Sequence, residues 1–101
     1  MELEKAIEKI DKESKKYKLA GALRDWADMV VEMATEREDI RNGIENHCIS
    51  ELIALVLKKS FETKVEVDEK IVKEAKLKPP IYLGVPSRAQ IKKWIVEVYT
   101  K

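Results

Sequence analysis

Three polar side chains between residues 41 and 47, namely Arg41, Asn42 and His47, are of types that can act on a phosphate ester. Histidine transfers protons near neutral pH, and arginine stabilises the negative charge that develops on phosphorus, so the pair suits metal-independent cleavage of a phosphodiester. Such cleavage requires the two side chains to meet. On an unbroken helix they would lie roughly 120° apart, because each residue turns about 100°. The chemistry therefore requires a break in the helix at Asn42-Gly43, a pair of residues that commonly ends helices.

The string RNGIENH, residues 41–47, resembles the signature of the HEPN family of helical-bundle ribonucleases, in which an arginine, often followed by a polar residue, precedes a histidine. The resemblance implies that Arg41 clamps the phosphate of RNA, that His47 is the general acid or base, and that Asn42 is their polar neighbour. It also implies an all-helical host and a site in a dimer cleft. The structural interpretation places Arg41 at a helix C-terminus, which the helix dipole favours, and His47 in the first turn of the next helix. We expect these structural roles for Arg41 and His47, and we keep the ribonuclease as an alternative.

A row of carboxylates recurs every three or four residues in the helix expected at 19–41. Magnesium needs carboxylates that converge from at least two elements. Glu36 and Asp39 are similar to half of the metal motif of MazG-type all-helical nucleotide pyrophosphatases, but the next helix has no matching pair, and His47-Cys48 alone does not make a zinc site. We therefore expect no metal and no cofactor, and interpret the row as a solvated face that could contact a partner protein. Its members are Asp25, Asp28, Glu32, Glu36 and Asp39.

Basic residues are concentrated in the last third of the chain. Residues 1–69 hold 12 basic and 17 acidic side chains, a net charge of −5, whereas residues 70–101 hold eight basic and two acidic side chains, a net charge of +6. Cations around an exposed aromatic ring and a helix N-terminus are what binding to a phosphate backbone needs. The last third is therefore expected to contact nucleic acid or an acidic protein surface. The candidate residues are Lys73, Lys76, Lys78, Tyr82, Ser87, Arg88, Lys92 and Lys93.

Apolar periodicity predicts an all-α fold, a compact bundle of four or five helices in a single domain that spans residues 1–101. Ser87 and Gln90 form a capping-box pattern at the start of the last helix. The segment before that helix contains prolines and a glycine and is expected to be a loop. The string ETKVEV, residues 62–67, alternates over too few residues to predict a strand. The expected helices are residues 2–17, 19–41, 44–61, 68–77 and 88–99, with a loop at 78–86.

Two of these helices carry expectations about packing. The helix at 2–17 has a thin apolar stripe, which either docks on the rest of the bundle or pairs with a second copy of the chain to form a homo-oligomer. Docking is favoured, and the homodimer stays open. The helix at 44–61 is apolar on most of its faces, so it is expected to lie at the centre of the bundle, enclosed by the others.

Composition bounds the compartment and the class of protein. Cys48 is the only cysteine, which fits a reducing compartment. The first residues lack the apolar run of an export signal, and no apolar run approaches about 18 residues, so we expect a cytoplasmic protein without a membrane segment. Abundant Glu and Lys beside few Gln and Asn favour a thermophilic source. The patterns together predict a small non-catalytic accessory or adaptor protein, with a ribonuclease, or a protein-binding module that uses the acidic row, as the alternatives.

Overall fold

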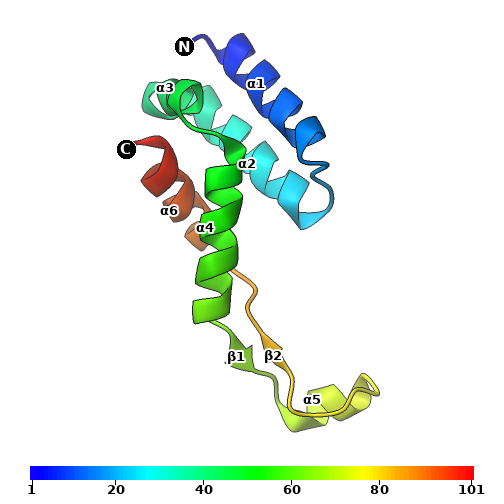
Figure 1. Ribbon diagram of the computed structural model, residues 1–101. Helices are drawn as coiled ribbons and strands as arrows, with labels where there is room; N and C mark the ends of the chain where they lie inside the picture. The colour runs from blue at the N-terminus through cyan, green and yellow to red at the C-terminus, as the bar shows by residue number, and fades with distance from the viewer.

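The computed structural model describes residues 1–101 and contains six α-helices and one two-stranded sheet. It confirms the all-α class, because each strand has only two residues. Five helices form a body, and the segment between α4 and α6 projects from it as an arm (Figure 1). None of the helices combines the length and the apolar character needed to span a membrane. The elements are α1 (Leu3–Lys16), α2 (Ala22–Glu36), α3 (Glu38–Asn46), α4 (Ile49–Glu62), β1 (Val65–Glu66), α5 (Glu69–Glu74), β2 (Tyr82–Leu83) and α6 (Arg88–Tyr99).

The body is held together by one apolar core. α1 packs against α2 and α3, and α6 packs against α3 and α4. α1 buries Ala6, Ile10 and Ser14, which recur every four residues and so lie on one face of the helix. The Ser14 hydroxyl donates a hydrogen bond to the Ile10 carbonyl at 2.7 Å, which satisfies the one polar side chain buried there. Ile10 and Ser14 of the thin N-terminal stripe are therefore docked within the chain, whereas Ile7 and Tyr17 are 40% and 42% exposed.

The break expected at Asn42-Gly43 does not occur, and that prediction is wrong. α2 ends instead at Glu36, where Arg37 has extended backbone angles, and α3 then runs unbroken through Gly43 to Asn46. A side chain at Gly43 would overlap the carbonyl group of Tyr99, so this glycine lets α3 and α6 approach closely and does not end a helix. The next break comes at His47 and Cys48, both extended. One long expected helix is thus two helices.

α4 is not enclosed, contrary to the expectation for the helix at 44–61. Only Ile49, Leu52 and Val56 are buried, whereas Leu57 is 49% exposed and Phe61 is 72% exposed. The expectation was wrong because α6 and α1 are the body helices that pack against α4, and together they cover one side of it. A second apolar face of α4 is left uncovered.

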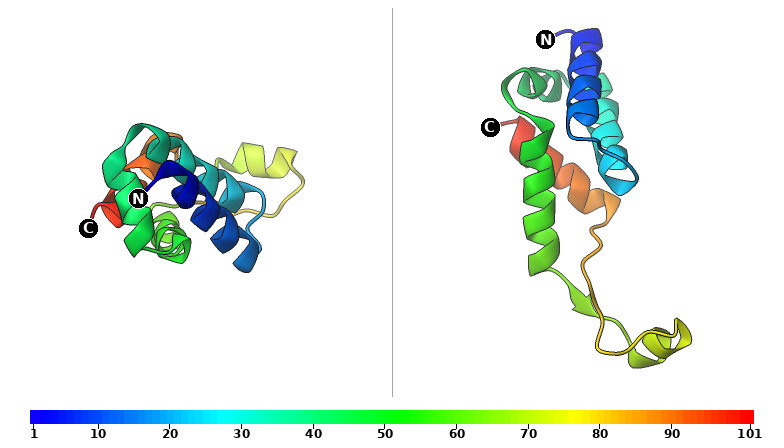
Figure 2. Two further views of the ribbon diagram at one scale, coloured as in Figure 1. Left: turned by 90° about the horizontal axis from the view of Figure 1, so that it is seen from above. Right: turned by 45° about the vertical axis from the view of Figure 1, so that its right-hand side comes forward.

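The arm, residues 63–86, is an antiparallel pair of short strands with α5 at its far end. Val65 pairs with Leu83, and Glu66 pairs with Tyr82. β2 thus lies in the segment expected to be a loop, and α5 is shorter than the helix expected at 68–77. The right-hand view of Figure 2, like Figure 1, shows α5 far from the body, at the end opposite the two chain termini. The molecule measures 50 × 24 × 19 Å, and its radius of gyration, 16.1 Å, exceeds the roughly 13 Å of a compact domain of this length.

Candidate interaction surface

Arg41 lies on α3, and its side chain closes the end of α2. Its Nη1 donates a hydrogen bond to the carbonyl oxygen of Ala34 at 2.8 Å. Ala34 belongs to the last turn of α2, whose carbonyl groups lack partners within the helix. A cation at this position also interacts favourably with the negative end of the helix dipole. Arg41 therefore has a structural role, at the C-terminus of a helix that precedes its own.

His47 ends α3, and its ring faces two other helices. Its Nδ1 lies 3.2 Å from a carboxylate oxygen of Glu51 on α4, and its ring meets that of Tyr99 on α6 edge-on, with 6.2 Å between the centroids. The hydrogen bond from the backbone N–H of Cys48 and the contact with His47 hold the pKa of Glu51 below its usual range. Burial raises the pKa of the Tyr99 hydroxyl, and this buried hydroxyl has no hydrogen-bond partner. The surroundings of His47 are thus those of a junction between three helices.

The three residues of the candidate ribonuclease site do not come together. Arg41 contacts α2, His47 contacts α4 and α6, and the amide oxygen of Asn42 accepts a hydrogen bond from the amino group of Met1 at 2.8 Å. Arg41 lies within α3, whereas His47 follows its last residue, and the two side chains contact different helices. None of these contacts favours cleavage of a phosphodiester.

The acidic row is divided between two helices and is partly neutralised within the chain. Asp25, Asp28, Glu32 and Glu36 belong to α2, and Asp39 belongs to α3. Three of the five carboxylates have an arginine partner, and no group of three or more His, Cys, Asp or Glu residues could hold a metal ion. The pairs are Asp28 with Arg24 at 3.2 Å, Glu32 with Arg88 at 3.4 Å, and Asp39 with Arg37 at 2.6 Å.

The basic residues of the last third lie in two separate groups. Lys73, Lys76 and Lys78 are at the far end of the arm, and Lys92 and Lys93 are on α6 in the body (Figure 1). The two groups of lysines are separated by the length of the arm, so they do not form the single basic surface that the sequence suggested.

Several of the remaining candidates are already engaged within the chain. Lys73 pairs with Glu69 at 3.0 Å, and Lys64 lies over the ring of Tyr82, with Nζ 5.7 Å from the centroid. The Ser87 hydroxyl accepts a hydrogen bond from the backbone N–H of Gln90 at 3.2 Å, as the capping-box pattern predicted. Ser87 therefore serves the start of α6.

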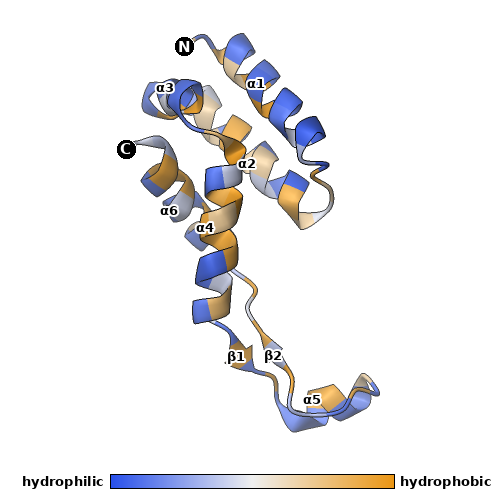
Figure 3. Ribbon diagram, in the orientation of Figure 1, coloured by the Kyte–Doolittle hydropathy of each residue, from blue (hydrophilic) through white to orange (hydrophobic).

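The arm is the feature that sequence reasoning missed, and it exposes several large apolar side chains. Val72 is its only buried residue. Hydropathy colouring shows apolar residues in α5 and along α4 (Figure 3). The signal available in the sequence was a set of large apolar residues in a segment where the sequence predicts a helix at 68–77 and a loop at 78–86. The large apolar side chains of the arm that are more than half exposed are Val65, Ile71, Leu77, Tyr82, Leu83 and Val85.

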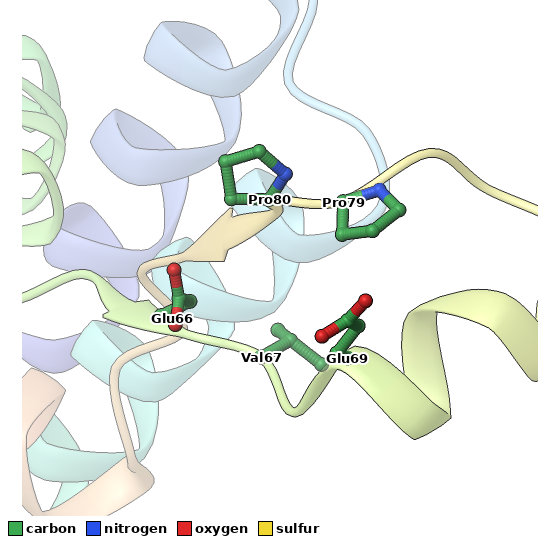
Figure 4. A pocket seen from close by; sticks show the side chains of 5 residues that line it. All are labelled: Glu66, Val67, Glu69, Pro79 and Pro80. Atoms are coloured by element: carbon green, nitrogen blue, oxygen red, sulfur yellow. The ribbon is translucent and has the colours of Figure 1, made fainter.

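A shallow pocket of about 310 Å³ lies between the strands of the arm and α5. Glu66, Val67 and Glu69 line one side of it, and Pro79 and Pro80, which are joined by a cis peptide bond, line the other (Figure 4). Its two carboxylates come from β1 and the start of α5. The pocket gives the arm a mixed surface, with carboxylates and proline rings side by side.

No family model matches the sequence, and neither a curated protein nor a solved structure matches it.

Proposed function

We propose that the protein is a non-catalytic adaptor and that the end of the arm binds another protein. The observation that carries the proposal is the exposure of the apolar side chains of the arm, above all Ile71 and Leu77, which are 59% and 56% exposed. Burying a large apolar side chain fully contributes about 1.5–3 kcal/mol. Monomeric proteins seldom leave such residues gathered on one projecting element, and gathered apolar surface marks sites of association.

Charge favours a protein over a nucleic acid as the partner. The arm holds five lysines and four carboxylates, so it is close to neutral. Binding to a phosphate backbone relies on an excess of cations, and apolar side chains do not contribute to it. Lys76 and Lys78 have no ion pair within the chain and flank Leu77, so they would suit a partner whose apolar groove has carboxylates at its rim.

A pull-down experiment tests the proposal. The protein is immobilised through its N-terminus and exposed to an extract of its native cells. Wild type is expected to retain a distinct protein that Ile71→Glu with Leu77→Glu loses. Glu8→Lys, an exposed change on α1, is the matched control and is expected to retain it. The arm substitutions leave the core intact, because both residues are exposed.

Treatment with nuclease separates the two kinds of partner. The proposal requires retention to survive nuclease and to fall when Lys76 and Lys78 are both changed to Glu. Retention that disappears with nuclease would instead identify nucleic acid as the partner. Retention that is equal in wild type and in the arm variant would contradict the proposal. A cytoplasmic location stays a prediction, supported by the single cysteine of the chain.

A further inference from the structure

α4 carries an uncovered apolar stripe in addition to the face that it buries in the body. The stripe, which we call the α4 seam, recurs at spacings of three or four residues, so its members share one side of the helix. It lies roughly 100° around the axis from the buried face of Ile49, Leu52 and Val56. The seam consists of Ser50, Ile53, Ala54, Leu57 and Phe61.

Two shallow hollows lie along the seam, and Leu57 belongs to both. The upper hollow, about 340 Å³, is lined by the seam from Ser50 to Leu57, by Tyr17 and Leu19 from the segment that joins α1 to α2, and by Leu23 from the first turn of α2. It has no charged residue in its lining. The lower hollow, about 260 Å³, is lined by Leu57 and Phe61 with parts of the arm, and Lys64 is its one charged residue. Phe61 is 72% exposed at the lower end.

We propose that a second copy of the chain packs on this seam, with the two α4 helices antiparallel and the two-fold axis passing by Leu57. The spacing of the seam makes it self-complementary, because Ile53 and Phe61 are each four residues from Leu57. The axis therefore sets Phe61 of each copy against Ile53 of the other, at the upper hollow. An interface of this isologous kind uses the same patch on both copies.

The antiparallel arrangement is preferred for two physical reasons. The dipoles of antiparallel helices attract each other, whereas those of parallel helices repel. A parallel pair would also stack Phe61 on the same residue of the other copy and leave both upper hollows unfilled. In the antiparallel pair, the ring of Phe61 from one copy fills the upper hollow of the other copy, whereas in the single chain this ring is exposed to solvent.

The exposed area supports a second copy as the occupant. The chain exposes 6943 Å², whereas a compact protein of 11.7 kDa is expected to expose about 5,900 Å². The excess, about 1,000 Å², includes the surface of the projecting arm, and it leaves the elongated chain with enough area for the roughly 800 Å² that each partner contributes to a stable interface of standard size. The apolar and nearly uncharged lining is also typical of homodimer interfaces, which are more apolar than other interfaces.

The seam is separate from the end of the arm, so this inference goes beyond the proposed adaptor function and stands without it. It also moves self-association away from α1, which already buries Ala6, Ile10 and Ser14 inside the body. Loss of a partner protein from the arm would leave the dimer unchanged, and loss of the dimer would leave the end of the arm unchanged.

Sedimentation velocity and light scattering of the purified full chain test the proposal. Wild type is expected to have twice the 11.7 kDa mass of the chain, and Phe61→Glu is expected to raise the dissociation constant at least about thirtyfold, as loss of a central aromatic anchor does. Ile71→Glu, an equally drastic change at the end of the arm, is the control and is expected to stay dimeric. A monomeric wild type would overturn the proposal, and so would a Phe61→Glu variant that stays dimeric with an unchanged circular dichroism spectrum.

Disulfide cross-linking in a Cys48→Ser background tests the orientation. Copies with Ile53→Cys are mixed with copies that have Phe61→Cys and a different tag, and disulfides between the two kinds of copy are expected to form. Lys58→Cys, about 100° around the helix from Leu57, is the control and is expected not to cross-link to itself. Preferential cross-linking of Phe61→Cys to itself would indicate parallel helices and overturn the antiparallel dimer.

Discussion

Arg41 and His47 use their polar groups at the ends of helices. The guanidinium group of Arg41 satisfies a carbonyl group at the end of α2, and the imidazole ring of His47 sits beside the carboxylate of Glu51 at the start of α4. Each contact gives a partner to a polar group at a helix end that has no partner within its own helix. A polar cluster at a junction of short helices is thus explained by the capping of those helices.

Arg41→Met is expected to lower the free energy of unfolding by about 1–3 kcal/mol, because it removes a charged donor from a partly buried carbonyl group. Equilibrium denaturation in urea measures the change. Arg37→Met is the matched control, since the ion pair of Arg37 with Asp39 is exposed to solvent, and its effect is expected to stay below about 1 kcal/mol. Equal effects of the two substitutions would contradict the capping role of Arg41.

Gly43→Ala is expected to destabilise the fold by about 1–3 kcal/mol, because the added methyl group would overlap the carbonyl group of Tyr99 and push α3 away from α6. Asn42→Ala, one residue earlier and exposed, is expected to change the stability by no more than about 0.5 kcal/mol. The midpoints of thermal unfolding compare the two. A stabilised Gly43→Ala variant would show that the helices do not meet closely at this point.

At the scale of the elements, local signals predicted helix ends only where the ends depend on local contacts. α6 begins at the predicted residue, because Ser87 and Gln90 cap its first turn without help from other elements. The break at Asn42-Gly43 was mispredicted, because the same glycine that suits a helix end also suits close packing, and only the position of α6 decides between them. The two strands were beyond prediction, since each depends on a partner 16 to 18 residues away.

The start of α4 is expected to make stability depend on pH through Glu51. Its pKa is lowered in the folded state, so Glu51 stabilises the fold above the unfolded pKa of about 4.3, and this contribution is lost as the pH falls through the folded pKa. Denaturant midpoints of wild type and Glu51→Gln, measured from about pH 7 to about pH 3, check this. The difference between them is expected to shrink below about pH 4. A difference that is constant with pH would contradict it.

At the scale of the whole molecule, the arm changes how the candidate residues are arranged. The sequence shows that basic residues are concentrated in the last third of the chain. Their separation into one group on the arm and one group on the body depends on the arm, whose two-residue strands are too short to be predicted from the sequence. The uncovered face of α4 was hidden for a related reason, since apolar residues around a helix predict burial without saying what buries them. Burial by a partner and burial by the core give the same sequence pattern.

Hydrogen exchange is expected to divide the molecule at the base of the arm. The amides of α5 are expected to exchange orders of magnitude faster than those of α3 and α6, because the arm buries only Val72 and has almost no contact with the core. Mass spectrometry of peptides from the intact protein resolves the two regions. Protection of α5 equal to that of α6 in the isolated protein would mean that the arm is held by contacts other than those seen here.

A photoreactive residue in place of Leu77 tests most directly whether the end of the arm contacts a protein. After illumination in native cells, the Leu77 position is expected to give a cross-linked protein that is resistant to nuclease, while the same residue in place of Glu8 on α1 does not. Yields that are equal at the two positions, or a Leu77 product that nuclease removes, would contradict the docking of the arm on a partner protein.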